Sequence, residues 1–219
     1  MPTTPTSARR GRPRGSEGRE LLSIARLMFV NHGYRGTTMD AVAASAHISK
    51  QSLYREYPSK DALYAAVVRD WVERGHDAMR PHANSLSESH EARDGLLALA
   101  AVLQDALLSP PVLQMRTLIA AEALRFPDVA SDYVTRSWAH NIHMLAEALG
   151  ALTARGLLRV DDPDLAAEQL TWLVVAAPLN RLTLQAGAHP YSDHELEQVA
   201  TQGVATFLSR YGPEHQNSR

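Results

Sequence analysis

Three consecutive polar residues, Lys50, Gln51 and Ser52, stand at the start of a short segment with helical spacing. Their ammonium, amide and hydroxyl groups can hydrogen-bond to base pairs, which present a distinct pattern of donors and acceptors in the major groove of DNA. A short helix reaches those base edges when its N-terminal residues enter the groove. These residues therefore predict direct contact with DNA bases.

Side chains suited to phosphate oxygens lie on both sides of this segment. Thr37 and Thr38 precede one predicted helix and Lys60 opens another, so each lies beside free backbone N–H groups that attract anions. Tyr54, within the polar segment itself, can offer its hydroxyl. We predict that these four residues contact the DNA backbone, which positions a protein on the duplex without reading its sequence.

Residues 1–16 contain proline, glycine, threonine and serine without apolar periodicity, which is typical of a disordered arm. Within them, Arg-Gly-Arg-Pro-Arg at 10–14 resembles the core of an AT-hook, in which Gly and Pro flanked by arginine enter a narrow A·T minor groove. Arg12 and Arg14 are the side chains that this pattern predicts to bind DNA. Contact with phosphates alone, or a solvated tail that binds nothing, are the alternatives.

Charge is distributed unevenly along the 219 residues. Residues 1–61 carry ten Lys and Arg against five Asp and Glu, whereas residues 62–219 carry twelve against nineteen. A basic head therefore precedes an acidic body. Such a head is typical of nucleic-acid contact, although a solvated charged face has the same composition.

The composition also excludes several classes of protein. The chain has no cysteine, so it is not a disulfide scaffold. Its longest apolar runs, 96–103 and 172–179, are far shorter than the about 20 residues that a membrane helix needs. Charged residues follow the N-terminal arginines where a signal peptide would have an apolar core. We therefore expect a cytoplasmic protein without a membrane partner.

Apolar residues at helical spacing cover most of the chain. Helices are predicted over 17–32, ending at Gly33, then from Thr37 or Thr38, from Ser49 to Tyr57, and after Pro58. Five more helices are predicted after residue 78. Prolines, glycines, an N-cap at Asp162–Pro163 and a capping box at 192–195 mark their ends. They span 90–108, 111–126, 128–155, 163–186 and 193–210. No alternating pattern typical of strands remains, so the fold class is all-α.

The second and third predicted helices are too short to be stable alone and are joined by a tight turn. Both must therefore pack on the first helix to bury their apolar faces. This arrangement is a helix-turn-helix, and the residues that could read bases begin its second helix. The sequence thus predicts a three-helix DNA-binding domain.

Residues 20–63 combine the segment HGYRGTT with SKQSLYREYPSK. In this combination the chain resembles the TetR family of bacterial transcriptional regulators. His47 stands where the family usually has glycine in the turn, so we expect His47 to adopt a positive φ, which His tolerates better than most residues. The matching positions are Leu22, Ala25, Phe29, Gly33, Tyr34, Thr37, Thr38, Ala46, Ser49, Leu53, Tyr54, Pro58, Ser59, Lys60 and Leu63.

The resemblance implies a homodimeric regulator, usually a repressor, that binds double-stranded DNA. A small-molecule effector bound in the C-terminal helical domain would change the spacing of the two DNA-binding heads. Two-fold symmetry then predicts a palindromic operator. We expect a disordered basic arm at 1–16, the helix-turn-helix domain at 17–62, a helical effector-binding and dimerisation domain at 63–211, and a disordered tail at 212–219.

The effector pocket is expected among the helices after residue 78, where a bundle can leave an apolar cavity with a few polar groups. Pro178 should kink its helix and free a carbonyl near Val174, at a pocket or at a dimer contact. Ordinary core packing would explain the same apolar positions. The candidate lining residues are Met115, Phe126, Trp138, Asn141, Met144, Trp172 and Asn180.

The dimer interface is expected on the last two long helices, by resemblance to the family and by their composition. The final helix has an apolar face with small residues that would let a partner helix approach closely. The alternative is that this face closes the core of its own chain. The candidate interface residues are Leu196, Val199, Ala200, Gly203, Val204 and Phe207.

Other chemistry is disfavoured by the residues. His140 with His143, and His189 with His194, have spacings found in metal sites, but no acidic third ligand is clearly placed, so we expect no metal and no cofactor. A Gly-rich phosphate loop, a Gly-x-Ser-x-Gly elbow and a cysteine nucleophile are missing from the sequence, which disfavours an enzyme. The alternatives to an effector-responsive repressor are a ligand-independent or architectural DNA-binding protein and a helical enzyme with a basic head. The acidic body argues against the architectural protein.

Overall fold

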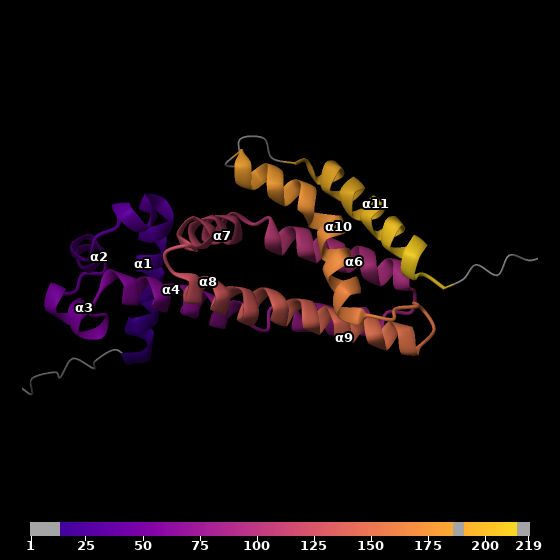
Figure 1. Ribbon diagram of the computed structural model, residues 1–219, viewed down its shortest axis with the longest axis horizontal. Coiled ribbons are helices and arrows are strands. Elements are labelled where there is room, and N and C mark those ends of the chain that lie inside the picture. The colour runs from indigo at the N-terminus through magenta and orange to yellow at the C-terminus, as the bar shows by residue number, and fades with distance from the viewer. Residues whose placement is uncertain (1–13, 186–190, 214–219) are drawn as a thin grey trace, which may run out of the picture. The chain divides into compact units, whose positions relative to one another are not determined.

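The computed structural model describes residues 14–185 and 191–213, and only the backbone of residues 14–17. The regular structure in this described part of the chain consists of helices and includes no strand, which confirms the predicted all-α class (Figure 1). The helices are α1 (Arg14–Gly36), α2 (Met39–Ser45), α3 (Lys50–Glu56), α4 (Lys60–Gly75), α5 (Arg80–Glu88), α6 (Ala92–Leu107), α7 (Pro110–Glu122), α8 (Pro127–Tyr133), the π-helix η1 (Val134–Ala139), α9 (His140–Ala154), α10 (Pro163–Leu184) and α11 (Asp193–Tyr211).

The chain forms two compact units, residues 1–70 and 71–219, and the boundary between them falls within α4. We call them the N-terminal unit and the C-terminal unit and describe each by itself. The sequence placed this boundary at residues 62 and 63, near the start of the same helix.

Aromatic packing holds the N-terminal unit together. Phe29 and Tyr34 stack with their ring centroids 6.0 Å apart, and Tyr64 of α4 meets both rings edge-on at 5.6 and 5.5 Å. Val42 of α2 and Leu53 of α3 are fully buried. Because helices of seven residues gain little stability from their own hydrogen bonds, this burial is what keeps α2 and α3 folded.

The first helix differs from its predicted bounds at both ends. It begins at Arg14, so residues 14–16 are helical and do not belong to an unstructured arm as predicted. At its other end the backbone leaves helical geometry at Gly33, with φ 68° and ψ 172°, before the last helical residues up to Gly36. Gly33 therefore breaks the helix at the predicted place, because glycine adopts positive φ without steric cost.

The turn of the helix-turn-helix forms around His47, which has φ 53° as expected. His47 donates its N–H to the carbonyl of Ala44, and Ile48 donates to Ala43, at 3.1 and 3.0 Å. These are the two hydrogen bonds of a Schellman motif, in which the left-handed residue is usually glycine. Histidine forms the same turn at the cost of left-handed strain.

Replacing His47 with glycine is expected to raise the free energy of unfolding by about 0.5–1 kcal/mol. Glycine removes left-handed strain of about 1–2 kcal/mol but adds conformational entropy to the unfolded chain. Urea denaturation followed by circular dichroism measures the change. As a control, Arg69→Gly at an exposed position inside α4 should lower stability by about 1 kcal/mol. A loss of stability in His47→Gly would show that the histidine side chain itself supports the turn.

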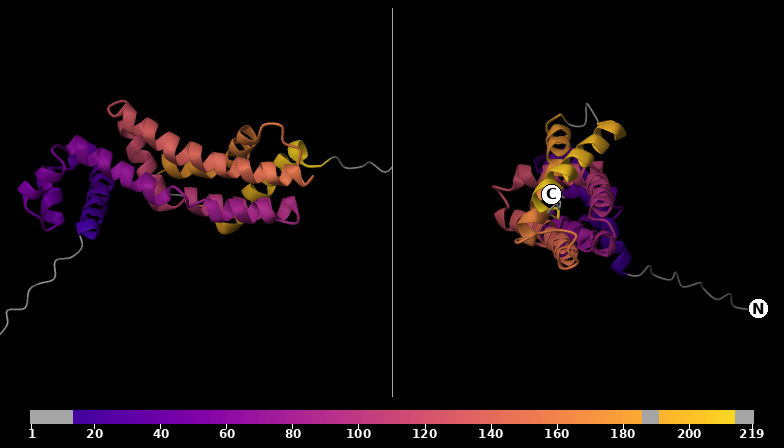
Figure 2. Two further views of the ribbon diagram at one scale, coloured as in Figure 1. Left: turned by 90° about the horizontal axis from the view of Figure 1, so that it is seen from below. Right: turned by 90° about the vertical axis from the view of Figure 1, so that its right-hand side faces the viewer.

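The C-terminal unit is a bundle whose core joins α5, α6, α9, α10 and α11. The largest fully buried side chains in it include Leu96, Leu149, Leu152 and Phe207. Figure 2 shows α8, η1 and α9 following one another along one long rod, while Figure 1 shows α10 beside α11. No single described helix is long and apolar enough to cross a membrane, although α6 and α7 together, bent by 61°, meet the criteria of length and composition.

Capping residues stand at the predicted starts of α10 and α11, and a glycine stands at the predicted end of α9. The Asp162 side chain accepts a hydrogen bond from the N–H of Leu165 at 3.0 Å. Ser192 and Glu195 form the predicted capping box. Gly156 follows α9 with φ 75°, the positive φ expected of a glycine that stops a helix.

Two elements differ from the prediction. The helix α5 was missed, since its buried face consists only of Ala83 and Leu86 among polar residues. The predicted helix 128–155 is instead α8, η1 and α9, with a six-residue π-helical segment in the middle. Hydrophobic periodicity does not reveal a π-helix, because the flanking α-helical pattern continues on both sides.

The proline inside α10 frees a carbonyl group, as predicted. Pro178 has no N–H to offer Val174 four residues earlier. The buried side chain of Gln104, on α6, donates from Nε2 to the Val174 carbonyl at 3.0 Å and to the Leu196 carbonyl of α11 at 2.9 Å. The side-chain amide of Gln104 on α6 therefore links α10 and α11 next to Pro178.

Candidate functional site

The start of α3 carries the residues predicted to read bases. Lys50 and Gln51 are exposed, Ser52 is half-buried, and Tyr54 is 47% exposed one turn further on. The helix begins there because the Ser49 hydroxyl accepts a hydrogen bond from the N–H of Ser52 at 3.0 Å. The sequence-predicted side chains are thus presented together on one short helix.

Lys50 is engaged by a neighbouring helix. Its Nζ lies 2.5 Å from the Asp40 carboxylate on α2, and both side chains are more than half exposed. Exposed ion pairs contribute about 0–1 kcal/mol, so a base or phosphate acceptor can compete for this ammonium.

Lys60 binds within the N-terminal unit instead of pointing freely into solvent. Its ammonium donates hydrogen bonds to the carbonyls of Tyr34 and Thr37, both at 2.9 Å, and lies 4.3 Å from the Tyr34 ring centroid. Two of its three protons therefore hold the segment that connects α1 to α2. The third proton remains for the phosphate contact predicted from the sequence.

Of the two predicted threonine contacts, the structure exposes only one. Thr37 is 1% exposed, and its hydroxyl lies 2.9 Å from the Gly33 carbonyl oxygen and 3.1 Å from that of Met28. Its side chain therefore fastens the connection to α1 and does not reach a DNA surface, which corrects the prediction. Thr38 is exposed and caps α2 by accepting from the N–H of Ala41 at 3.1 Å. Arg12 and the side chain of Arg14 lie outside the described residues.

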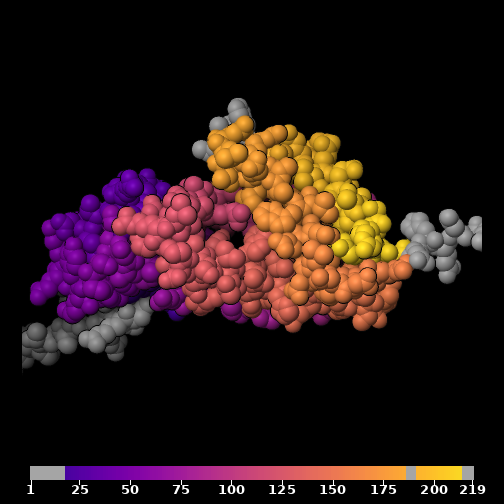
Figure 3. Space-filling view, in the orientation of Figure 1, coloured from indigo at the N-terminus to yellow at the C-terminus, as the bar shows by residue number. Residues whose placement is uncertain are grey.

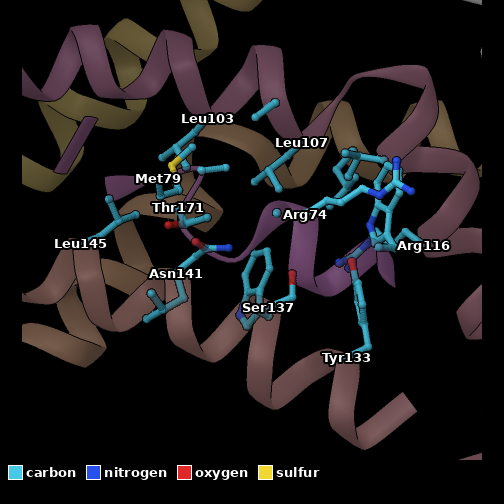
Figure 4. Close-up of a pocket in the computed structure, with 18 residues that line it drawn as sticks. Arg74, Met79, Leu103, Leu107, Arg116, Tyr133, Ser137, Asn141, Leu145 and Thr171 are labelled. Carbon is cyan, nitrogen blue, oxygen red and sulfur yellow. The ribbon is translucent and has the colours of Figure 1, made fainter. Parts of the chain in front are cut away.

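The C-terminal unit encloses a cavity of about 290 Å³ (Figure 4). Arg74, Arg116 and Tyr133 line one end, Met79, Leu103 and Leu145 line the other, and Ser137 and Asn141 lie between them. The other lining residues are Trp71, Gly75, Ala78, Ala106, Leu107, Val112, Trp138, Ile142, Thr171 and Leu179.

The polar end of this pocket is built by Arg116 of α7 and Tyr133 at the end of α8. Arg116 and Tyr133 line the same end of the pocket, and the Arg116 guanidinium lies 5.8 Å from the centroid of a Trp138 ring. Burial raises the pKa of Tyr133, and the nearby arginine only partly opposes this effect. The phenol therefore keeps its proton at neutral pH and can donate it to a ligand.

The middle of the pocket contains an unsatisfied acceptor. Asn141 Oδ1 is buried and has no hydrogen-bond partner in the described part of the chain. A buried unpaired acceptor costs about 1–3 kcal/mol, so a ligand that offers a donor there gains the corresponding free energy.

Two of the seven residues predicted for the pocket line it, Trp138 and Asn141. Met115 is fully buried elsewhere, Met144 lines a second, polar hollow, and Asn180 is exposed. Phe126 is half-buried outside the cavity. Trp172 packs against Trp138 with centroids 4.9 Å apart and ring planes inclined by 31°, but it borders another groove. The sequence analysis missed Arg74, Arg116 and Tyr133; the signal that could have found them is a charged or phenolic side chain within apolar helical patterns.

The apolar face of α11 lies within the core of its own chain, contrary to the predicted dimer interface. Ala200, Gly203, Val204 and Phe207 are all buried. A Cβ on Gly203 would lie 3.0 Å from the Leu173 carbonyl oxygen and 3.0 Å from Val174 Cγ1, so this glycine permits α10 to approach. Leu196 and Val199 are half-buried.

A different face of α10 and α11 is open. Leu173 is 39% exposed and Leu165 is 49% exposed, and with Trp172 they border a groove of about 600 Å³ that continues to the end of α11. The surfaces of α10 and α11 adjoin in Figure 3. We call this surface the α10–α11 face.

One group of three possible metal ligands occurs among the described residues, and it differs from the predicted pairs. His140 Nε2 lies 3.7 Å from the Asp77 carboxylate, and the His140 ring stacks on His76 with centroids 3.9 Å apart and planes 7° from parallel. Parallel stacked rings direct their nitrogens side by side and not toward one point. His143 instead contacts Asp164 at 3.1 Å, and His189 lies outside the described residues. Arg80, as a hydrogen-bond donor, holds the Asp77 pKa below its usual value.

Two family models match the chain. Residues 21–67 match the bacterial regulatory proteins of the tetR family, and residues 94–213 match the C-terminal domain of AefR-like transcriptional repressors. An uncharacterized HTH-type transcriptional regulator of Mycobacterium tuberculosis is 37% identical over 84 residues. That alignment spans 38% of this chain and 38% of the relative.

Solved structures resemble the chain over more of its length. A TetR-family transcriptional regulator of Mesorhizobium loti has a TM-score of 0.85 and 31% identity, covering 92% of this chain and all of that one. The flavonoid-responsive regulator FrrA has a TM-score of 0.69 and 26% identity, with the same coverage. The match to the C-terminal family model extends over more than half of the sequence. The chain therefore belongs to the TetR family of bacterial, DNA-binding transcriptional regulators.

Proposed function

We propose that this protein is a homodimeric repressor that leaves a palindromic operator when a small molecule enters the pocket of the C-terminal unit. The observation that carries the proposal is the course of α4. Lys60 at its start holds the connection between α1 and α2, and Trp71, Arg74 and Gly75 at its end line the pocket. A displacement of the pocket end of α4 would therefore be carried along the same helix to the DNA-binding unit.

Similar proteins support the finer parts of this proposal. The C-terminal family model is described as that of a repressor, and FrrA is described as flavonoid-responsive. These similarities support repression and a small-molecule effector for the present chain. Since its DNA partner would be bacterial DNA, we place the protein in the cytoplasm.

For DNA binding, we propose that Lys50 and Gln51 of α3 reach base edges, while Tyr54, Thr38 and the remaining proton of Lys60 contact phosphates. In a two-fold dimer the two copies of α3 would enter successive major grooves about 34–36 Å apart. The effector would favour a conformation in which this spacing is lost. Such release requires that the effector binds the two conformations with different affinity.

For the dimer, we propose that a second copy covers the α10–α11 face. This face carries the exposed leucines Leu165 and Leu173. An isologous contact of helix pairs would bury these side chains on both copies at once. The buried residues of α11 are thereby replaced as interface candidates by residues of the exposed face.

The experiment that tests the function measures binding to the DNA upstream of the protein's own gene. Fluorescence anisotropy is recorded with and without a panel of small molecules that includes flavonoids and monocarboxylates with an apolar body. We expect a complex with two protein chains on one DNA site, and at least one compound that weakens it. If no compound weakens the complex, the ligand-independent reading is favoured instead.

Selection from random DNA tests the proposed base contacts. Gln51→Ala should change the preferred bases at one position of each half-site, because a good bidentate contact is worth about 1–3 kcal/mol against the wrong base. Gln114→Ala, at an exposed position of α7, is the matched control and should select the wild-type site. If Gln51→Ala also selects that site, α3 does not read bases through this side chain.

A further inference from the structure

The polar end of the pocket carries positive charge from Arg116, beside Arg74. Arg116 makes no ion pair with a described carboxylate, and no Asp or Glu is among the residues that line the cavity. Arg116 as a whole is half-buried, and its guanidinium lies 5.8 Å from the centroid of a Trp138 ring. A cation that is partly removed from water without a counterion is unfavourable, so an anionic ligand would stabilise it.

The hydrogen-bonding capacity at this end suits a carboxylate. Arg116 has five N–H donors, and Tyr133 at the same end of the cavity adds one O–H donor. Because arginine has no acceptor, the hydrogen of the Tyr133 hydroxyl is left to be donated elsewhere. A carboxylate at this point can accept from both groups, and hydrogen bonds to ionised groups are about twice as strong as neutral ones.

The remainder of the cavity is apolar. Leu103, Leu145 and Met79 close the end opposite to Arg116, and Trp71 and Trp138 are also part of the wall. This arrangement suits one flat or flexible hydrocarbon body attached to one charged group. A ligand with a quaternary or primary ammonium group would be repelled by the arginine and would find no acidic side chain in the cavity wall to pair with.

We propose that the pocket selects a monocarboxylate with an apolar, ring-bearing body, whose carboxylate binds Arg116 and Tyr133. The inference rests on the proposed function for its regulatory meaning, but the binding it describes can be measured without DNA. Arg116 supplies the charge and Tyr133 a neutral donor. The unpartnered oxygen of Asn141 adds a preference for a ligand that carries a hydroxyl or amide N–H near its middle.

Three probes of one shape and different charge test the proposal: 4-phenylbutanoate, 4-phenylbutanamide and 4-phenylbutylammonium. Isothermal titration calorimetry on the full chain should give the order carboxylate, amide, ammonium, with the carboxylate about 10-fold or more tighter than the amide. Arg116→Met should weaken the carboxylate about 10- to 100-fold and leave the amide unchanged. Tyr133→Phe should weaken the carboxylate by a smaller factor.

The matched control is Arg93→Met, which removes an exposed arginine of α6 that does not line the pocket, and it should change no affinity. The comparison of the three probes on the wild-type chain requires no variant and stays decisive if a variant fails to fold. Equal binding of carboxylate and amide, tighter binding of the ammonium, or no carboxylate binding at millimolar concentration would overturn the proposal.

The DNA assay separates this inference from the proposed function. Release of DNA by neutral and anionic probes alike would support the proposed regulatory function. It would contradict the proposed preference for an anionic ligand. Selective binding of the carboxylate without any change in DNA affinity would support the proposed binding site. It would contradict the proposal that the effector releases the protein from DNA. Selective binding together with DNA release is the result that we expect.

Discussion

Phe207→Glu is expected to abolish folding of the C-terminal unit, whereas Leu173→Glu is expected to give a folded chain that no longer dimerises. Phe207 is 1% exposed and packs on Tyr211 with ring centroids 4.7 Å apart. Removing a buried phenylalanine costs about 3–5 kcal/mol, and a buried unpaired carboxylate adds several more. Their total is comparable to the whole stability of a domain, about 5–15 kcal/mol.

Leu173 lies on the α10–α11 face and is 39% exposed, so a carboxylate there remains in water in the isolated chain. It would be buried only against a second copy. We expect native circular dichroism, a monomer in sedimentation, and operator affinity reduced by about 100-fold or more, because two linked heads bind far more tightly than one. Leu124→Glu, at a fully exposed leucine after α7, should behave as the wild type. A folded monomer in Phe207→Glu would instead return the interface to the apolar face of α11.

The second large effect concerns the proline of α10. Gln104→Leu approximately keeps the volume of the side chain but leaves the Val174 carbonyl without the Gln104 donor. It is expected to lower the free energy of unfolding by about 1–3 kcal/mol. Pro178→Ala restores an N–H four residues after Val174. In the double variant the loss should therefore be smaller than the sum of the single losses by at least about 1 kcal/mol.

Urea denaturation of the two single variants and the double variant measures this coupling. Gln114→Leu, an exposed glutamine of α7, controls for the change from amide to hydrocarbon and should alter stability little. Strict additivity of the Gln104 and Pro178 substitutions would mean that the buried amide does not compensate for the proline.

Local signals in the sequence predicted the helix boundaries well. Ser192, Asp162 and Gly156 act through hydrogen bonds and backbone angles within a few residues, so their types alone indicate their roles. The turn at His47 was predictable from the resemblance to the TetR family, in which glycine usually stands at this position. The π-helix was not, since its widened turn depends on the packing around it and leaves no pattern in the residue types.

Residues far apart in the chain were harder to assign. The pattern of α11 shows that one face is apolar, but it cannot tell whether α10 of the same chain or a partner covers that face. Thr37 has the right type for a phosphate contact, yet the close approach of the α1 end buries it. The pocket depends on Arg74, Arg116 and Tyr133, which come from three different helices and are brought together only by the fold.

The π-helix η1 makes the length of its segment critical. Ser137 and Trp138 line the pocket from within it, and Tyr133 lies directly before it. Each residue of an α-helix turns the chain by about 100° and advances it by 1.5 Å. A relative that lacked a single residue here, and so continued as a regular α-helix, would direct a different side chain toward Arg116. One-residue insertions and deletions in this segment are therefore a route by which related chains could exchange one ligand for another without changing the rest of the bundle.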